Sequence, residues 1–122
     1  MPQSETDSLL DVAHLGAQTF ADPALEREVL ALFEEQCARL GPLVCGPGSR
    51  GERADAAHAL KGAARAIGAR RVAALAEALE AALAREGSDP APVAAELAAA
   101  IAATRAAVAA RRDPLASAAG LA

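Results

Sequence analysis

Residues 51–68 read GERADAAHALKGAARAIG, and they combine an apolar stripe with a polar face at helical spacing. The apolar positions recur every three or four residues, as on one buried helix face: Ala56, Leu60, Ala63 or Ala64, and Ile67. At about 100° per residue, His58 lies roughly 160° from Leu60 and is expected to face solvent. Gly68 suits a left-handed helix terminator. The stretch therefore predicts an amphipathic helix over about 51–67 with His58 on its outer face.

The outer face of this helix also carries Lys61, Gly62 and Arg65, which lie three, four and seven residues after His58. In a helix interior glycine costs about 1 kcal/mol relative to alanine, yet this chain uses alanine almost everywhere else. An exposed imidazole, a cation one turn on and a missing side chain between them predict a site that another macromolecule approaches closely.

Similar stripes and start signals predict helices along the rest of the chain. Asp22-Pro23 and Asp89-Pro90 each combine an N-cap acceptor with proline at the first helical position. Phe20 and Leu32 are expected to pack inward, and Gly41-Pro42 is expected to disturb the end of the second helix. The predicted helices cover about 8–20, 23–40, 51–67, 70–86 and 90–112.

These helices, joined by short loops, predict an all-α fold: an antiparallel up-down four-helix bundle with a short additional N-terminal helix. The bundle domain is expected to span residues 8–112. Residues 1–7 and 113–122 are expected to be flexible ends, because they are polar or made mostly of small residues.

Charge and composition narrow the function classes. The formal net charge of −4 argues against nucleic acid or an anionic membrane as the main partner. The segment from Arg50 to Arg71, however, contains six basic and two acidic residues, which gives it a local charge of +4. Charged residues on a helix face can also serve only to solvate it. The sequence shows no signal peptide and no uninterrupted apolar span, so a cytoplasmic protein is expected. Cys37 and Cys45, about 12 Å apart if both are helical, are too distant for a disulfide.

The residues around His58 exclude several kinds of chemistry. No His, Cys or carboxylate stands three or four residues after His58, and only Asp55 lies one turn before it, so a metal site is not expected. The face offers no Ser, Thr or Cys as a hydrolytic nucleophile and no apolar pocket for a small substrate. What remains is the imidazole as the nucleophile, taking a phosphoryl group on a ring nitrogen, with Lys61 pairing with the phosphoryl oxygens.

The segment from Ala57 to Gly62, with Gly68-Ala69 and Leu79-Glu80 beyond it, resembles the histidine phosphotransfer (HPt) domains of bacterial multistep phosphorelays. The resemblance covers roughly residues 10–110. It implies that His58 is the phosphoacceptor, through the ring nitrogen remote from the backbone. Lys61 would steady the phosphoryl group, and Gly62 would permit docking. Gly68 would close the helix.

The same resemblance implies the partners. These would be aspartate-bearing receiver domains of response regulators and a hybrid sensor histidine kinase, with transfer in both directions. Magnesium would be held by the receiver, so no cofactor is expected on this chain, which would be a monomeric phosphocarrier without autokinase activity. Ala63 and Ala64 lack the hydroxyl often found after the family's glycine. Gln36 and Arg65 are the candidates for the further phosphoryl contact that a family glutamine provides.

Three alternatives stay open at this point. If Lys61 and Gly62 stand beside His58 only by chance, His58 would be an exposed histidine without a role. A helical bundle that binds a receiver or kinase without transferring phosphate would show the same face. Chemotaxis-kinase phosphotransfer domains share much of the pattern, but this chain has no room for an ATP-binding domain, which favours a freestanding shuttle.

Overall fold

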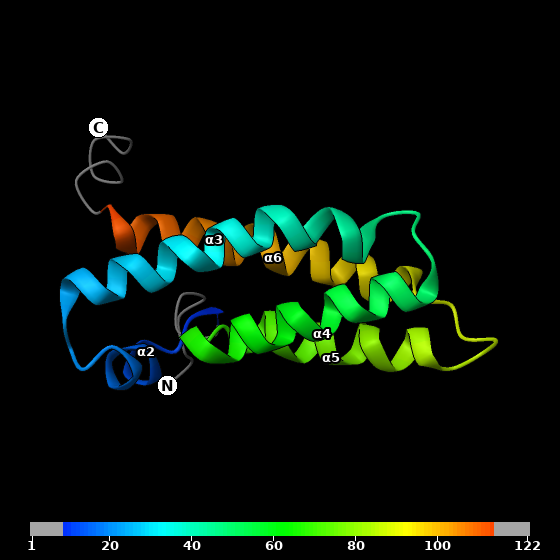
Figure 1. Ribbon diagram of the computed structural model, residues 1–122, viewed down its shortest axis with the longest axis horizontal. Helices are drawn as coiled ribbons and strands as arrows, with labels where there is room; N and C mark the ends of the chain where they lie inside the picture. The colour runs from blue at the N-terminus through cyan, green and yellow to red at the C-terminus, as the bar shows by residue number, and fades with distance from the viewer. Residues whose placement is uncertain (1–8, 114–122) are drawn as a thin grey trace, which may run out of the picture.

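The computed structural model describes residues 9–113, and every element within that range is a helix (Figure 1). This confirms the all-α prediction. The ends expected to be flexible lie outside the described residues, apart from Asp113. The helices are α2 (Val12–Gln18), α3 (Pro23–Cys45), α4 (Arg50–Ile67), α5 (Arg70–Ala84) and α6 (Ala91–Arg112).

The long helices α3, α4, α5 and α6 lie side by side along the long axis of the molecule, and successive helices run in opposite directions (Figure 1). Helix α4 contacts α3 and α5, and α6 contacts the same two helices from the other side. The short helix α2 packs on α4 at the end of the molecule where α4 finishes. One side of α4 is thus buried and the other is left outside.

The helix starts follow the capping residues of the sequence. The Asp22 carboxylate accepts hydrogen bonds from the backbone N–H groups of Ala24 and Leu25, so α3 begins at Pro23 as predicted. Ser49 caps α4 by accepting from the N–H of Glu52. Gly68 ends α4 at a φ of 80°, in the left-handed conformation expected of it.

The core of α4 matches the predicted stripe, because Ala56, Leu60, Ala64 and Ile67 are all buried. Two packing predictions were wrong. Phe20 is 86% exposed because it lies in the turn after α2, at a φ of 54°, where the chain reverses into α3. Leu32 is 52% exposed because it lies beside the buried stripe of α3, which consists of Leu30, Phe33, Cys37, Leu40 and Val44.

The prediction that Gly41-Pro42 disturbs the end of the second helix was also wrong, since α3 continues to Cys45 with Pro42 inside it. Proline removes one backbone donor, but its fixed φ is compatible with a helix. The extra turn buries Val44, whose carbonyl accepts a hydrogen bond from Nε of Arg53 at 3.1 Å. Tertiary packing therefore outweighs the local breaker.

Cys37 and Cys45 are both free, in agreement with the spacing argument. Burial raises the pKa of the Cys37 thiol to about 11, so this cysteine is a packing residue and a poor nucleophile at neutral pH.

Helix α6 is long and apolar enough, by length and composition alone, to cross a membrane. A core helix of a globular bundle has the same composition. Helix α6 packs on α3 and α5 and buries Leu97, Ile101 and Val108 there, so one face of α6 belongs to the core of the bundle.

Candidate functional site

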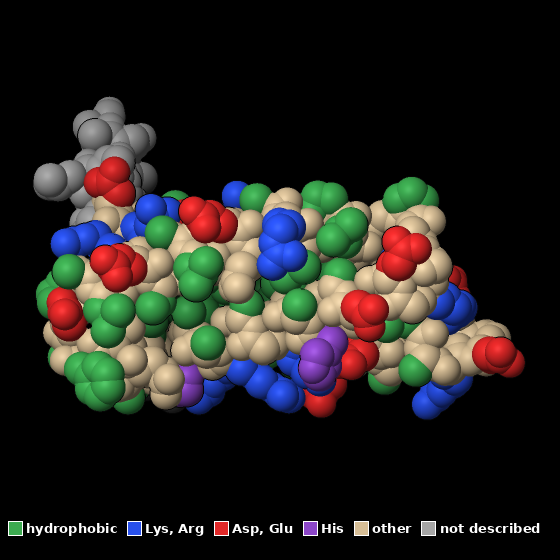
Figure 2. Space-filling view, viewed as in Figure 1, with side chains coloured by type: hydrophobic (Ala, Val, Ile, Leu, Met, Phe, Trp, Pro, Cys, Tyr) green, Lys and Arg blue, Asp and Glu red, His purple; other side chains and the backbone are tan. Residues whose placement is uncertain are grey.

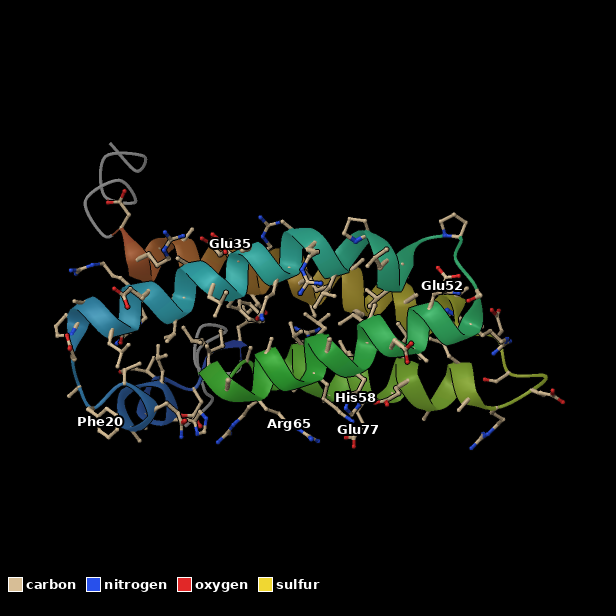
Figure 3. All side chains as sticks on the ribbon, viewed as in Figure 1. Phe20, Glu35, Glu52, His58, Arg65 and Glu77 are labelled. Atoms are coloured by element: carbon tan, nitrogen blue, oxygen red, sulfur yellow. The ribbon has the colours of Figure 1, made fainter. Side chains whose placement is uncertain are left out.

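His58 stands on the outer face of α4, and its side chain is 69% exposed, as the helical spacing predicted. Figure 2 shows acidic and basic side chains gathered around a protruding histidine on the α4–α5 side of the molecule. His58, Arg65 and Glu77 point away from the bundle on this side (Figure 3). The face is open to a large partner.

One carboxylate, that of Glu80, contacts both predicted site residues, although local sequence spacing does not predict it. Glu80 of α5 places Oε2 3.0 Å from Nδ1 of His58 and Oε1 2.9 Å from Nζ of Lys61. A single side chain thus holds both predicted residues. Glu80 lies 22 residues after His58, and only the packing of α5 against α4 brings the two together. The only signal in the sequence was the Leu79-Glu80 pair within the family resemblance.

The Glu80 contact fixes which ring nitrogen of His58 is free. An ionised carboxylate only accepts hydrogen bonds, so Nδ1 carries the hydrogen and Nε2 of the neutral ring keeps its lone pair. Within residues 9–113, Nε2 of His58 has no hydrogen-bond partner. The hydrogen bond from Lys61, followed by that from His58, lowers the pKa of Glu80 below its ordinary value of 4.5 and keeps it ionised at neutral pH.

Lys61 lies one turn after His58, and its side chain is only 14% exposed. Its ammonium group reaches across to α5 and is neutralised by Glu80. Glu80 therefore holds the Lys61 ammonium group beside the His58 imidazole, because its carboxylate bonds to both side chains.

Gly62 is exposed, and a Cβ added there would meet no atom within 4 Å beyond its own helix. Its φ is not positive, so the backbone does not require glycine either. Nothing in the described chain therefore requires glycine at this position, and the exposed backbone there leaves room for a partner to approach.

The other predicted site residues are spread more widely. Arg65 continues the outer face and forms an ion pair of 3.5 Å with Glu77. Gly68 is buried, and a Cβ added there would come within 2.9 Å of the Asp11 carbonyl oxygen. Gln36 is half-buried on α3, and within the described chain its side chain makes no hydrogen bond to His58 or Lys61. The structure thus groups His58 with Lys61 and leaves these three outside that group.

The basic segment from Arg50 to Arg71 is largely engaged within the fold. The Arg50 guanidinium donates to the carbonyls of Ala82, Leu83 and Ser88, and so closes the end of α5 at Ala84, two residues before the predicted end. Arg70 pairs with Asp11 at 2.7 Å. The local charge of +4 therefore exists in the sequence, but much of it holds helix ends together.

His14, the other histidine of the chain, is half-buried and has a structural contact. Its Nε2 lies 3.0 Å from the carbonyl oxygen of Arg65, at the last turn of α4. No lysine and glycine follow it at the spacing seen after His58. His14 therefore provides a natural control for His58.

Residues 9–113 contain no cluster of three or more His, Cys, Asp or Glu side chains that would hold a metal ion. The arrangement offers instead a nucleophilic nitrogen, an adjacent cation, a carboxylate behind both and open space in front. These parts suit the transfer of an anionic group between macromolecules.

The family model described as Hpt domain matches residues 26–107, which include α4, α5 and most of α3 and α6. Comparison with curated proteins and with solved structures gave no match.

Proposed function

This chain belongs to the Hpt domain family, which carries out histidine phosphotransfer in phosphorelays, and we propose that His58 is its phosphoacceptor. The observation that carries the proposal is the outward Nε2 of an exposed imidazole whose Nδ1 is held by Glu80. His14 offers no such atom, because its Nε2 contacts the backbone of α4.

The proposed step is a direct transfer between an aspartyl phosphate and His58. The lone pair of Nε2 attacks the phosphorus atom, the N–P bond forms, and the bond from phosphorus to the aspartate oxygen breaks. The aspartate leaves as a carboxylate and keeps the bonding electrons. The ring becomes positively polarised and retains its proton on Nδ1, where the Glu80 carboxylate stabilises it. The reverse step passes the phosphoryl group to a second receiver.

Two neighbours of His58 support this step. Lys61 supplies a positive charge beside the phosphoryl oxygens, and Glu80 keeps it in place until the substrate arrives. Gly62 leaves space for the partner to bring its aspartate within bonding distance of Nε2. We assign Gly68 to shaping the end of α4. Gln36 and Arg65 are the further candidates for a contact with the phosphoryl group or the partner.

In this proposal the chain is a freestanding, monomeric phosphocarrier of the cytoplasm, built as an up-down four-helix bundle. It receives phosphate from the receiver domain of a hybrid sensor histidine kinase and passes it to a response regulator. Magnesium belongs to the receiver domains in this scheme, and the chain has no autokinase activity. A bundle that binds receivers without transfer is the alternative, and no feature of the His58 geometry favours it.

The test is incubation of the protein with a purified receiver domain carrying radiolabelled phosphate. Label is expected to move to the wild-type chain and to be labile in acid and stable in base. It is expected to be lost in His58→Gln and retained in the matched control His14→Gln. Binding of the receiver without transfer of label would favour the interaction module, and transfer to His58→Gln would refute the assignment.

A further inference from the structure

The charge pairs along the α4–α5 groove fall into two classes. Lys61 and Glu80 are 14% and 31% exposed and lie 2.9 Å apart. Arg65, one turn after Lys61 on α4, and Glu77, one turn before Glu80 on α5, are 59% and 60% exposed and lie 3.5 Å apart. An exposed pair at this distance contributes little to folding, because water screens both charges. The Arg65–Glu77 pair can therefore open at small cost, whereas the Lys61–Glu80 pair belongs to the site.

Arg65 is close enough to His58 to be covered by any partner that reaches the imidazole. Seven residues along a helix correspond to about 10 Å. A standard protein interface buries about 800 Å² on each partner, which corresponds to a disc of about 16 Å radius. A receiver centred on Nε2 of His58 would therefore lie over both Arg65 and Glu77.

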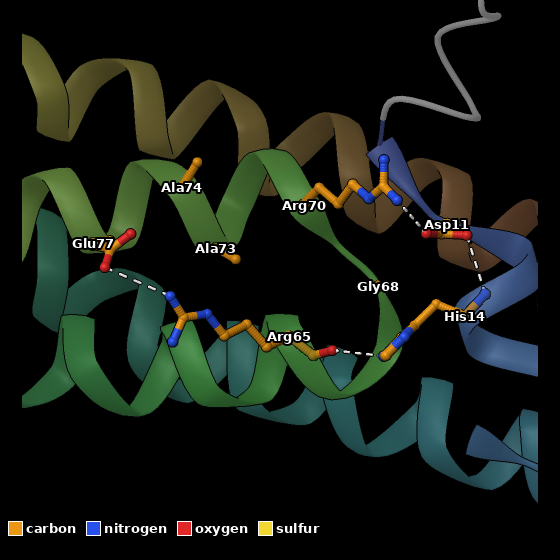
Figure 4. Close-up of a pocket in the computed structure, with 8 residues that line it drawn as sticks. All are labelled: Asp11, His14, Arg65, Gly68, Arg70, Ala73, Ala74 and Glu77. Atoms are coloured by element: carbon orange, nitrogen blue, oxygen red, sulfur yellow. Dashed lines mark hydrogen bonds and ion pairs between the residues drawn. The ribbon is translucent and has the colours of Figure 1, made fainter. Parts of the chain in front are cut away.

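A cleft of about 450 Å³ opens beside this pair (Figure 4). Its lining includes Ala73, Ala74 and Gly68, which leave room because their side chains are small or absent. Arg65 from α4 and Glu77 from α5 form their ion pair at one end of this cleft. A side chain of the partner can enter here and reach either charge.

The other end of the cleft is held by several contacts around Asp11. Asp11 accepts hydrogen bonds from Arg70 at 2.7 Å and from the backbone N–H of His14 at 3.0 Å, and its own N–H donates to the Gly68 carbonyl at 2.9 Å. The His14 hydrogen bond, together with Arg70, lowers the pKa of Asp11. These contacts hold α2 in place, whereas the Arg65–Glu77 end of the cleft is held by one exposed ion pair.

We propose that Arg65 and Glu77 are specificity-determining residues that select among receiver domains. The pair opens on docking, Arg65 takes an acidic side chain of the receiver, and Glu77 takes a cationic one. This inference rests on the proposed phosphotransfer function and deepens it. Complementary charges at such a rim steer encounter, and like charges placed opposite each other reject a partner.

The test compares two receiver domains that carry opposite charges beside their phosphorylated aspartate. Arg65→Glu is expected to lower kcat/KM about tenfold for the receiver with the acidic side chain opposite it, and to lower it much less for the other. The double variant Arg65→Glu/Glu77→Arg keeps an internal ion pair but exchanges its ends, and is expected to reverse the preference between the two receivers. The neutral variant Arg65→Gln is expected to weaken the preference without reversing it.

The matched control exchanges another ion pair, Arg111 with Glu26, which joins α6 to α3 at 2.8 Å. The variant Arg111→Glu/Glu26→Arg is expected to keep the wild-type preference. If Arg65→Glu/Glu77→Arg restores the wild-type preference instead of reversing it, the pair is structural and the inference is refuted. Calorimetric titration of the same receivers measures their preference independently of transfer. Reversed binding without label on His58 would therefore refute the phosphotransfer function alone.

Discussion

Replacing Gly62 separates the demands of the fold from those of the partner. Gly62 lies inside α4, and a Cβ there meets no atom within 4 Å, so Gly62→Ala introduces no clash. Alanine is better than glycine in a helix interior by about 0.5–1 kcal/mol. For a domain of this size, that gain corresponds to a rise in Tm of about 2–5 °C, measured by thermal unfolding followed by circular dichroism.

Side chains at position 62 are expected to impair phosphoryl transfer, although they leave the fold intact. A side chain at this position displaces the docked receiver, and a misplacement of about 1 Å can lower the rate about 100-fold. Gly62→Gln is expected to show a loss of this order in kcat/KM, with the fold intact, and Gly62→Ala a smaller loss. The assay is rapid-quench transfer of label from a phosphorylated receiver, with the receiver concentration varied.

Gly16→Ala is the matched control, because Gly16 also lies inside a helix, α2, with no atom within 4 Å of an added Cβ. Gly16 lines a cleft with residues of α3 and α6, such as Glu26 and Ala107, and does not lie on the α4–α5 face that carries His58, so this variant is expected to transfer at the wild-type rate. Two results would refute the reasoning: a loss of stability in Gly62→Ala, or wild-type transfer by Gly62→Gln.

Three further changes have defined outcomes. Lys61→Ala is expected to slow transfer about tenfold with an unchanged circular dichroism spectrum, because it removes the charge beside the phosphoryl oxygens, and an unchanged rate would contradict that role. Glu80→Gln removes a carboxylate whose pKa is lowered in the folded state. The free energy of unfolding of the wild type should therefore exceed that of Glu80→Gln by its full amount above pH 4.5. This difference should disappear as the pH falls through the lowered pKa that Glu80 has in the folded protein. Urea unfolding between about pH 3 and pH 7 measures this, and a difference independent of pH would contradict it. Thr104 is fully buried, and within residues 9–113 its Oγ1 has no hydrogen-bond partner. Thr104→Val should therefore raise the free energy of unfolding by about 1 kcal/mol in the same assay, and a decrease would indicate a hidden partner.

The sequence was sufficient to predict α4 and its exposed face, because both follow from periodicity within one helix. The buried stripe of Leu60 and its neighbours, the outward direction of His58 and the end at Gly68 all depend on local spacing. Local capping chemistry likewise predicted the start of α3 at Pro23.

What the sequence did not predict depends on how helices pack against one another. Glu80 joins the site only because α5 lies against α4 in one particular register, and no local pattern specifies that register. The continuation of α3 past Pro42 depends on the burial of Val44, and Phe20 is exposed because of where the chain turns. In each case a tertiary contact, or the lack of one, outweighs the local signal.

The sharpest test of Nε2 of His58 as the acceptor atom is nuclear magnetic resonance of the phosphorylated protein with ¹⁵N-labelled histidine. We expect coupling between phosphorus and Nε2 of His58, with Nδ1 still protonated toward Glu80. Phosphate on Nδ1 of His58, or on His14, would contradict the proposed site.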